Sequence, residues 1–522
     1  MHNLSVISLC DEEIIASIRQ LVPQGFLEPQ DPLLLKQLWL QTADLITAFQ
    51  AAGRLQDNPF ADAWQRRIHL YETEIRSQIA GETVLVTGGK GCVGSRLLGE
   101  LYRLGASRII CIDQLGMLNE PGLDGIAYYT ADVRDYALLE QIFASEKPAI
   151  VFHLAAQRDP GLAEVRIRET VTTNIFGTQN IIDLCERFGV RQCVFSSTGK
   201  AARYWTSEVY AASKKMAEWL FARAATKGKV TYSMVRFTHM LQNSLVCQQI
   251  DEKIKKNRAV NVHAPERYIV AQNVYEAVDL LLNSLVHCVS GRLRFAVARN
   301  LGWPVETLEV ALYKILRSGK TLPIYFQGIP SGYEEPFFMG QVDWRAPSEI
   351  NTLVNALESP GMSLDASGGM VFCELTDFSP LVLELHLTRL KKLADDRTVE
   401  ASLLKSELSE AVRQVAASSF ALTPPESLLR LLWWGCAPKR LASQGYAIAA
   451  HRGIVETIVP QLHARVDAEV VRCAGLEASE FAELLEILAK LPDIGANELR
   501  IEIKPPSLKT PPQAPLSTCR LE

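Results

Sequence analysis

Apolar residues recur at helical spacing through the first 80 positions of the chain. Asp31-Pro32 combines a helix-capping residue with a first-turn proline, and Gly53 marks the end of the predicted helix. After Asn58-Pro59, apolar residues three or four positions apart predict another continuous helix: Phe60, Trp64, Ile68, Tyr71, Ile75 and Ile79. We interpret residues 1–80 as a helical N-terminal segment whose apolar stripe packs on the following domain. A partner-binding face is the alternative interpretation.

From Gly81 onward, short apolar runs alternate with helical stretches. The runs predicted as strands are residues 83–86, 108–112, 149–154, 192–196 and 232–237. Strands that alternate with helices form a parallel sheet that helices cover on both faces. The expected fold class is therefore α/β: a Rossmann-type doubly wound parallel sheet, with mainly helical segments added at its N-terminal and C-terminal ends.

Beyond about residue 366 the pattern becomes mainly helical again. Pro424-Pro425-Glu426 begins one predicted helix, and residues 479–490 form another. Residues 504–522 contain five prolines and are expected to be disordered. The expected organisation is a helical segment at 1–80, an α/β domain at 81–345, a mainly helical domain at 346–503 and a proline-rich tail at 504–522.

Length and composition narrow the class of protein. A chain of 522 residues exceeds the roughly 250–300 residues that one core supports, so several domains are expected. The net charge of −5 and the lack of a basic stripe argue against nucleic-acid binding. The eleven cysteines and nine histidines lack metal-ligand spacing, so no metal is expected. No apolar run approaches the ~20 residues of a membrane span, and the start does not resemble a signal peptide, so we expect a cytoplasmic protein.

A glycine-rich turn lies between the first predicted strand and the next helix. Gly88, Gly91 and Gly94 have the spacing G-x-x-G-x-x-G, with Cys92 and Val93 between the last two. Such glycines allow the backbone to turn tightly and to approach a pyrophosphate at a helix N-terminus. The alternative is a tight turn without a ligand. The strand before the turn and the helix after it favour a dinucleotide site.

Two aspartates extend this candidate cofactor site. Asp113 ends the next predicted strand, 19 residues beyond Gly94, where a carboxylate binds ribose hydroxyls and repels a 2′-phosphate. Neither Asp113 nor Gln114 supplies the cation that NADP requires, so we expect NAD as the cofactor. Asp132-Val133 follows the third strand, where we expect contact with the adenine.

In their order along the chain, these motifs resemble the extended short-chain dehydrogenase/reductase superfamily. The segments that carry the resemblance are the glycine turn and residues 132–135, 151–156, 174–178, 235–237, 267–268 and 328–335. Ser197-Thr198-Gly199-Lys200-Ala201 is similar to the S-T-D-K-A signature of its polysaccharide-biosynthesis group, the UDP-N-acetylglucosamine 4,6-dehydratases and their epimerase relatives. The resemblance covers residues 81–345 and implies an NAD-binding catalytic domain in which Ala155 lies beside the cofactor. It also implies a nucleotide-sugar-like substrate and a homodimer formed through helices at 171–188 and 210–225.

The family's catalytic pair maps onto Tyr210 and Lys214, which form a Y-x-x-x-K motif. We expect the Lys214 ammonium, one helical turn away, to lower the phenol pKa of Tyr210 from ~10 toward neutrality and so make it a general base. Lys214 would also contact the nicotinamide ribose, and Thr198 would share a hydrogen bond with the substrate hydroxyl. A chance Y-x-x-x-K on an exposed helix is the alternative. His153 is expected to pack near the cofactor without a direct role.

Several positions depart from the family's pattern. Gly199 replaces the aspartate that protonates the departing 6-hydroxyl in the dehydratases, while Lys200, the base at C5, is retained. His239 replaces an asparagine near the pyrophosphate, and Arg267 remains as a candidate pyrophosphate ligand. Residues 328–333 lack the arginine of the family's G-L-R-P-G-E stretch. An unchanged substrate and a changed substrate other than a UDP-sugar both stay open.

Three functions follow from these observations. The first is an enzyme that oxidises a sugar-like secondary alcohol through bound NAD and returns the hydride within one cycle, as epimerases and dehydratases do. The second is a net NAD-dependent oxidoreductase on a non-nucleotide substrate, and the third is a non-catalytic cofactor-binding scaffold. Without an acid at Gly199, elimination of water is doubtful, whereas oxidation needs only Thr198, Tyr210 and Lys214. Residues 203–209 are also about two positions longer than the family's spacing.

Overall fold

A computed structural model describes residues 11–23, 27–115 and 125–499, so the expected disordered tail at 504–522 lies outside the described residues. Its strands are β1 (Thr83–Thr87), β2 (Arg108–Asp113), β3 (Ile126–Thr130), β4 (Ile150–His153), β5 (Gln192–Thr198), β6 (Thr231–Phe237), β7 (His239–Met240), β8 (Val260–Val262), β9 (Tyr268–Ile269), β10 (Ala271–Gln272), β11 (Arg294–Ala298), β12 (Val305–Glu306), β13 (Ile324–Phe326), β14 (Ser363–Leu364) and β15 (Met370–Glu374). Its α-helices are α1 (Asp11–Leu21), α2 (Pro32–Ala51), α3 (Ala61–Gln65), α4 (Glu72–Ile79), α5 (Cys92–Arg103), α6 (Tyr136–Glu146), α7 (Pro160–Val165), α8 (Ile167–Val171), α9 (Thr178–Phe188), α10 (Val209–Ala225), α11 (Leu245–Lys255), α12 (Val274–Val286), α13 (Thr307–Ser318), α14 (Pro380–Asp395), α15 (Ala401–Leu422), α16 (Pro425–Cys436), α17 (Pro438–Gln444), α18 (Arg452–Ile458), α19 (Ala468–Cys473) and α20 (Ala478–Leu488).

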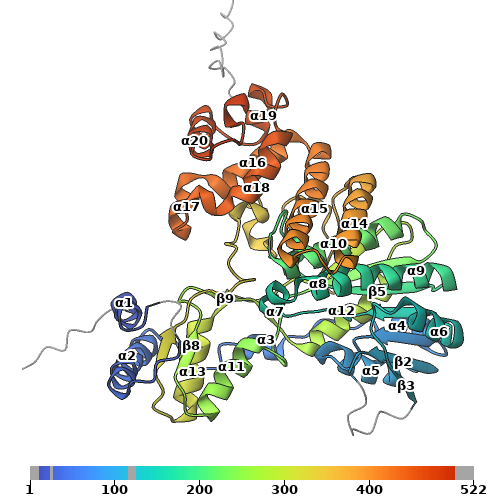
Figure 1. The fold of residues 1–522 in the computed structure, drawn as a ribbon, viewed down its shortest axis with the longest axis horizontal. Coiled ribbons are helices and arrows are strands. Elements are labelled where there is room, and N and C mark those ends of the chain that lie inside the picture. The colour runs from blue at the N-terminus through green and yellow to red at the C-terminus, as the bar shows by residue number, and fades with distance from the viewer. Residues whose placement is uncertain (1–10, 24–26, 116–124, 500–522) are drawn as a thin grey trace, which may run out of the picture. The chain divides into compact units, whose positions relative to one another are not determined.

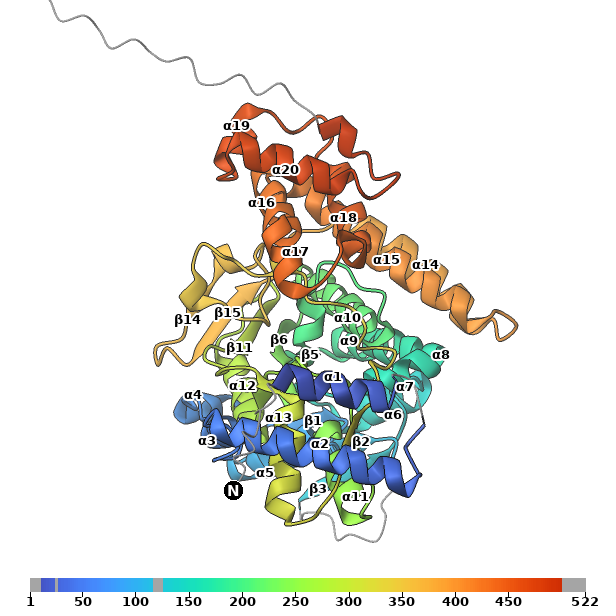
Figure 2. The ribbon, with the colours of Figure 1, turned by 90° about the vertical axis from the view of Figure 1, so that its left-hand side faces the viewer.

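A mainly parallel sheet organises the part of the chain that contains the sequence motifs. Among the described residues it has nine strands, in the order β14-β15-β11-β6-β5-β4-β1-β2-β3 (Figure 2). The strands from β3 to β11 run parallel, and β15 and β14 add an antiparallel edge. Helices α4, α5 and α12 pack on one face, and α6, α9 and α10 pack on the other (Figure 1). The predicted α/β class, a doubly wound Rossmann-type sheet, is confirmed.

The predicted strands are all present, with ends that differ by one or two residues. The helical character expected beyond residue 366 is wrong at β15, which pairs antiparallel with β11. Four of the five β15 residues are buried, so the strand is a short apolar run without alternation. Such a run does not distinguish a buried strand from a buried helix, and only its pairing with a strand some 75 positions earlier decides the outcome.

The single helix predicted after Asn58-Pro59 is two helices, α3 and α4. The backbone between them is held by amide side chains of α12 and its N-cap: Asn273 donates to the carbonyl oxygen of Arg66 at 2.8 Å, and Asn283 donates to that of His69 at 2.8 Å. The Arg66 guanidinium pairs with Glu276 at 2.6 Å. These tertiary hydrogen bonds replace the helical ones in the linker, so the continuous helix predicted from the apolar spacing is wrong there.

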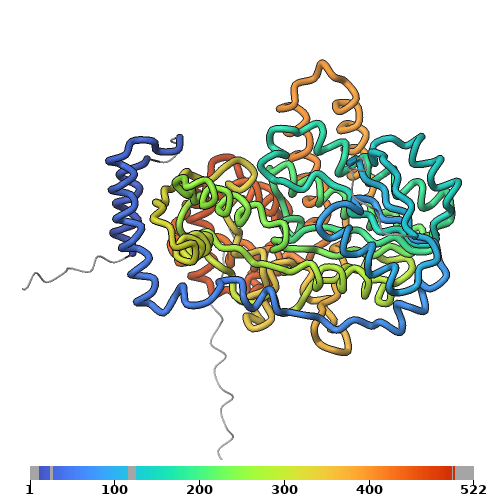
Figure 3. The backbone as a smooth tube through the Cα atoms, turned by 90° about the horizontal axis from the view of Figure 1, so that it is seen from below, coloured from blue at the N-terminus to red at the C-terminus, as the bar shows by residue number. Residues whose placement is uncertain are grey.

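The N-terminal helices α1 and α2 lie beside the segments that follow β6 (Figure 3). As predicted, Asp31 caps α2, accepting a hydrogen bond from the backbone N–H of Leu34 at 2.8 Å. Apolar residues of α1 and α2 share one core with α11, α13, β8 and β13: Ile14, Ile18, Leu38, Leu45, Phe49, Ile250, Ile254, Val260, Leu308, Leu312, Ile324 and Phe326. The apolar faces of α1 and α2 therefore pack within the chain. Of the stripe predicted after Asn58-Pro59, Phe60, Ile75 and Ile79 are also buried, whereas Trp64 is 40% exposed.

The described chain forms two compact units, Met1–Phe337 with Gln341–Ser419 and Phe338–Gly340 with Phe420–Glu522. The boundary expected after residue 345 therefore differs from the observed one, because β15 joins the central sheet and α14 and α15 pack on the same unit. In the second unit, α16 and α20 correspond to the two helices predicted there. Their apolar faces pack together around Leu428, Leu432, Leu484 and Leu488.

The hairpin formed by α14 and α15 covers the helices through which a homodimer was expected (Figure 1). Arg168 of α8 donates to the carbonyl oxygens of Ala394 and Val399, at 2.5 and 2.6 Å. The rings of Trp219 on α10 and Phe378 lie 6.0 Å apart, and Arg223 on α10 pairs with α14. The hairpin thus contacts α8 and α10 on that surface within one chain. Separately, in the parts of the chain that the structure describes, no helix combines the length and apolarity needed to cross a membrane.

Candidate active site

The glycine turn joins the end of β1 to α5. Gly88 has a φ of +71°, and a Cβ at that position would lie 2.8 Å from the amide nitrogen of Ala155, at the end of β4. A Cβ at Gly94 would overlap the carbonyl oxygen of Gly88. Both positions therefore exclude larger side chains, and the structure brings the turn against Ala155 as the resemblance implied.

The first turn of α5 faces this glycine loop. Gly91 is the N-cap residue and offers no side chain to bond the first backbone N–H groups, which belong to Cys92, Val93 and their neighbours. N–H groups left in this way can bind a phosphate oxygen. The turn and helix start therefore fit the pyrophosphate of a dinucleotide.

Asp113 ends β2 beside this turn. Its carboxylate accepts hydrogen bonds from the backbone N–H groups of Lys90 and Leu115, both at 3.0 Å. The Lys90 ammonium donates to the carbonyl oxygen of Leu115 at 2.8 Å, so a cation lies at the same corner of the sheet. The sequence interpretation considered only Asp113 and Gln114 and missed Lys90.

The Asp132-Val133 pair follows β3, as expected. Asp132 pairs with Arg134 at 2.5 Å, and although burial opposes the shift, these hydrogen bonds lower the pKa of Asp132. Val133 packs against Gly177, where a Cβ would lie 2.7 Å from its side chain. The carboxylate is therefore held by Arg134, and its contact with an adenine stays a prediction.

Thr198, Tyr210 and Lys214 come together at the carboxyl end of β5. Thr198 is the last residue of β5, and its side chain is hydrogen-bonded to the Tyr210 hydroxyl near the start of α10. The Lys214 ammonium donates to the carbonyl oxygen of Ser196 at 2.6 Å and lies 4.1 Å from the centre of the Phe195 ring. Tertiary structure thus brings these residues together beside the glycine turn.

The charges around Tyr210 differ from the expectation. Desolvation raises the pKa of Tyr210, and the hydrogen bond from Thr198 and the positive charge of Arg158 oppose the rise. The expected lowering by Lys214 is wrong in this structure, because burial lowers the pKa of Lys214 itself to about 7. Arg158, on the loop after β4, is a nearby cation that sequence reasoning missed. In the sequence, the only feature that could have pointed to Arg158 is its place as a basic residue just beyond the end of a predicted strand.

Lys200 is held in an ion pair. Its ammonium lies 2.6 Å from a carboxylate oxygen of Glu208 and donates to the carbonyl oxygen of Gly332 at 2.7 Å. Glu208 comes from the segment that is longer than the family's spacing, and it also pairs with Arg203 at 2.9 Å. Burial lowers the pKa of Lys200, and the Glu208 charge opposes that shift. A lysine paired in this way is poorly placed to act as a free base.

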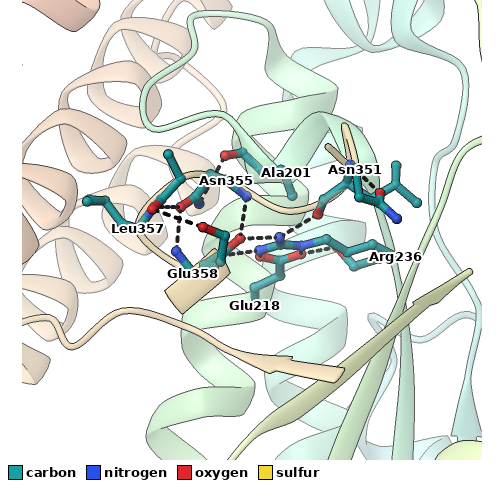
Figure 4. Close-up of polar contacts among 12 residues, drawn as sticks. Ala201, Glu218, Arg236, Asn351, Asn355, Leu357 and Glu358 are labelled. Atoms are coloured by element: carbon teal, nitrogen blue, oxygen red, sulfur yellow. Dashed lines mark hydrogen bonds and ion pairs between the residues drawn. The ribbon is translucent and has the colours of Figure 1, made fainter. Parts of the chain in front are cut away.

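The position of the missing acid is covered by an apolar side chain. A Cβ at Gly199 would overlap Cδ2 of Leu353, which is only 2% exposed. Figure 4 shows the buried network that holds the segment containing Leu353. There the Arg236 guanidinium forms paired hydrogen bonds to Glu218 at 2.8 and 2.9 Å, paired bonds to Glu358 at 2.7 and 2.8 Å, and one to the carbonyl oxygen of Leu353 at 2.8 Å.

The predicted substrate residues lie on the segments that follow β6. Burial lowers the pKa of His239 to about 4, and its Nε2 lies 2.6 Å from the Ser244 hydroxyl, so the ring is neutral near pH 7. Arg267 lies near His263, whose pKa is lowered by burial and by the Arg267 charge. The His263 ring lies 5.9 Å from that of Tyr333. His239 thus lies within reach of the Arg158 charge and Arg267 lies beside His263, and their roles as substrate ligands stay predictions.

His153 packs beneath the site, as expected. Its two ring nitrogens lie 2.8 Å from the Thr87 hydroxyl and 3.0 Å from the Thr178 hydroxyl. Burial lowers the pKa of His153 to about 3, so the ring stays neutral. Among the residues that the structure describes, no cluster of three or more histidine, cysteine, aspartate or glutamate side chains could hold a metal ion.

Comparisons with known proteins agree with this geometry. Residues 84–333 match the family described as polysaccharide biosynthesis protein. The chain is 28% identical over 310 residues to the probable polysaccharide biosynthesis protein EpsC of Bacillus subtilis, covering 56% of this chain and 51% of EpsC. It is 31% identical over 170 residues to a UDP-N-acetylglucosamine 4,6-dehydratase (inverting) of Campylobacter jejuni, covering 31% of this chain and 50% of the dehydratase. The resemblance expected from the motifs is confirmed.

Among solved structures, the UDP-glucose 4-epimerase of Thermus thermophilus in complex with NAD is similar, with a TM-score of 0.42 and 21% identity. The similarity covers 48% of this chain and 88% of that one. The chain spans about half the length of the curated relatives named above. It is also 25% identical over 253 residues to a UDP-glucose 4-epimerase of Rickettsia rickettsii, covering 45% of this chain and 72% of that one, so it is related to nucleotide-sugar epimerases and dehydratases.

Proposed function

We propose that this protein is an NAD-dependent enzyme that oxidises a secondary alcohol of a nucleotide sugar and returns the hydride within the same cycle. The observation that carries the proposal is the Tyr210 hydroxyl, hydrogen-bonded to Thr198 at the end of β5, with Lys214 one turn behind it. This group lies on the side of the sheet where the glycine turn ends β1. The names of the relatives support a nucleotide sugar as the substrate class.

The chain's own residues account for the proton transfer. Thr198 and Tyr210 would both hydrogen-bond to the substrate hydroxyl. The Tyr210 phenolate, which burial disfavours and the positive charge of Arg158 favours, would take the hydroxyl proton as the C–O bond becomes a carbonyl. When bound, NAD supplies the acceptor for the hydride that leaves the same carbon. In the return direction, Tyr210 would give the proton back to the oxygen, and a sugar that has turned in the site would leave as the epimer.

The cofactor assignment rests on the corner formed by β1 and β2. Gly88 and Gly94 leave space that a Cβ would fill, and the uncapped start of α5 suits a pyrophosphate. The Asp113 carboxylate is placed to accept bonds from ribose hydroxyls and to repel a 2′-phosphate. These features support NAD as the cofactor. The Lys90 ammonium weakens the expected preference for NAD over NADP.

Two contacts favour a cycle without elimination of water. Leu353 fills the space beside Gly199, so an apolar side chain stands where the family's aspartate would be. Lys200 is paired with Glu208 and is not a free base for C5. Without these groups, a 4,6-dehydration would lose general acid–base help, which is typically worth ~10²–10⁴ in rate.

The test is product analysis with NAD and UDP-N-acetylglucosamine or UDP-glucose, by nuclear magnetic resonance and mass spectrometry. We expect the 4-epimer at unchanged mass without net formation of NADH. Tyr210→Phe should reduce turnover by ~10²-fold or more while NAD binding persists, with Tyr446→Phe in the second unit as the control. A product lighter by one water would contradict the proposed cycle, and stoichiometric NADH would favour the net oxidoreductase.

A further inference from the structure

Arg158 stands on a turn between β4 and α7 whose backbone is fixed on both sides. The side chain of Asn174, which is 1% exposed, accepts a hydrogen bond from the Gln157 N–H at 2.8 Å and donates to the Gln157 carbonyl oxygen at 3.0 Å. Asp159 caps α7 by accepting a bond from the Leu162 N–H at 3.1 Å. The position from which the Arg158 side chain extends is therefore well defined.

The same clamp ties the turn to the catalytic helix. The Asn174 amide also donates to the Ser213 hydroxyl on α10 at 3.0 Å, one residue before Lys214. Asn174 lies in a π-helical turn between α8 and α9, and such turns are frequent at functional sites. The turn that carries Arg158 and the helix that carries Tyr210 and Lys214 thus form one rigid arrangement.

The Arg158 guanidinium is exposed and unpaired. Among the residues that the structure describes, none forms a hydrogen bond or an ion pair with it. Buried Arg236 provides the contrast, because Glu218, Glu358 and Leu353 satisfy its donors. A guanidinium presents five N–H donors, so Arg158 offers a set of donors that the protein itself leaves unused.

The positive charge of Arg158 acts on groups from four separate segments of the site. It opposes the rise in pKa that burial causes for Cys92 in the glycine turn, Tyr210 on α10 and Tyr333, and it adds to the lowering that burial causes for His239 on β7. For each of these groups burial has the largest influence, and Arg158 is a charged neighbour that they share. Arg158 is therefore a cation near the glycine turn, the candidate base, β7 and residues 328–335.

The stretch that lacks the family's arginine packs directly on the Arg158 turn. A Cβ at Gly332 would lie 2.5 Å from the carbonyl oxygen of Pro160, and a Cβ at Gly161 would lie 3.8 Å from that of Ser331. Residues 328–335 and residues 158–161 are thus in close backbone contact. An arginine at position 158 can therefore bind the same ligand group as the arginine that residues 328–333 lack.

We propose that Arg158 binds the diphosphate of the nucleotide-sugar substrate and takes the place of the arginine missing from residues 328–333. This inference rests on the proposed function. A guanidinium forms two parallel hydrogen bonds to phosphate oxygens, a geometry that an ammonium does not reproduce. A diphosphate held by Arg158 would place the attached sugar toward Tyr210, on a turn that Asn174 fixes to the catalytic helix.

The test compares ligands with and without the diphosphate. Calorimetry on the full chain would measure the affinities of UDP, uridine and NAD for the wild type, Arg158→Gln and Arg158→Lys. Arg166→Gln is the matched control, because Arg166 is an exposed arginine at the end of α7. We expect Arg158→Gln to weaken UDP binding about tenfold or more, with uridine and NAD affinities within about threefold of the wild type. Arg158→Lys should recover part of the loss, and Arg166→Gln should show none.

A kinetic readout separates binding from support of the fold. Arg158→Gln should raise KM for the nucleotide sugar more than it lowers kcat. It should also raise the apparent pKa of Tyr210 in the pH profile of kcat/KM, because Tyr210 loses a neighbouring cation. Unchanged UDP affinity in Arg158→Gln would overturn the proposal, and so would a loss confined to NAD or equal losses for UDP and uridine. A wild type that binds UDP through Arg158 without converting any nucleotide sugar would count against the proposed function alone.

Discussion

Leu353 occupies the space that a side chain at Gly199 would need. A Cβ built on Gly199 overlaps Cδ2 of Leu353, which is buried and whose carbonyl oxygen accepts a hydrogen bond from Arg236 at 2.8 Å. Leu353 lies beyond residues 84–333, which match the family. The space in which an acidic side chain at position 199 would lie is therefore filled by an apolar side chain from outside the matched residues.

Gly199→Asp should destabilise the protein. An added side chain overpacks the contact with Leu353, and overpacking typically costs about 1–3 kcal/mol. Leu353→Ala alone should also destabilise, by about 2–5 kcal/mol, because it leaves a cavity. The double variant should be less destabilised than the sum of the two, as measured by urea unfolding in a double-mutant cycle. Additive effects would show that the two positions do not compete for space.

The same variants test the chemistry at this position. Gly199→Asp alone should form no product lighter by one water, because its carboxyl has no room beside the substrate. In the double variant the carboxyl gains room, yet Lys200 remains paired with Glu208, so any dehydrated product should form slowly. Mass spectrometry of the nucleotide sugars detects it. Rapid dehydration by the single variant would contradict the packing argument.

The preference for NAD over NADP should depend on the charge of Asp113. The Lys90 and Leu115 N–H groups bond different oxygens of Asp113, so Asp113→Asn keeps an acceptor for only one of them, and it removes the charge that repels a 2′-phosphate. We expect the wild type to bind NAD more tightly and Asp113→Asn to gain NADP affinity. The gain should disappear in Asp113→Asn with Lys90→Ala, because the Lys90 ammonium is then absent. Calorimetry with both cofactors is the measurement, and tighter NADP binding by the wild type would contradict the assignment.

Lys214 should make the stability of the free protein depend on pH. Burial lowers its pKa from 10.5 to about 7, so between these values the unfolded chain holds more protons than the folded one and stability rises with pH. Below about pH 7 the cost of burying the ammonium is fully present. Lys214→Met should therefore stabilise the protein more at about pH 6.5 than at about pH 9.5 in denaturant unfolding. Lys36→Met on an exposed face of α2 is the control and should show no such difference.

The surface of α8, α9 and α10 should not be available to a second copy of the chain. Arg168 and Trp219 of this surface contact the α14–α15 hairpin, whose displacement would break the Arg168 bonds to Ala394 and Val399. Light scattering should therefore show no dimer that depends on these helices, up to about 100 µM, well above a micromolar dissociation constant. A dimer with cross-links between the α9 helices of two copies would restore the homodimer expected from the resemblance.

Several features could be predicted from the sequence because they depend on local rules. Five strands of the parallel sheet were visible as short apolar runs, whereas β3 and β11 were not among the predicted strands. The cap at Asp31 and the glycine turn follow from what the backbone allows at each position. The Tyr210 and Lys214 spacing is likewise a local property of one helix. These features suffice for the fold class and for the candidate cofactor and catalytic residues.

Other features depend on contacts between distant positions, which no periodicity encodes. The helix predicted through residues 60–79 breaks because Asn273 and Asn283, some 200 positions later, hold its backbone extended. The raised pKa of Tyr210 reflects the side chains that pack around it, and the cation beside it is Arg158 on another loop. Leu353 meets Gly199 only because Arg236 binds its segment in the core. The sequence alone thus determined which elements and motifs are present, whereas tertiary packing decided which charges stay unpaired and which space is filled, because both depend on close contacts between remote side chains.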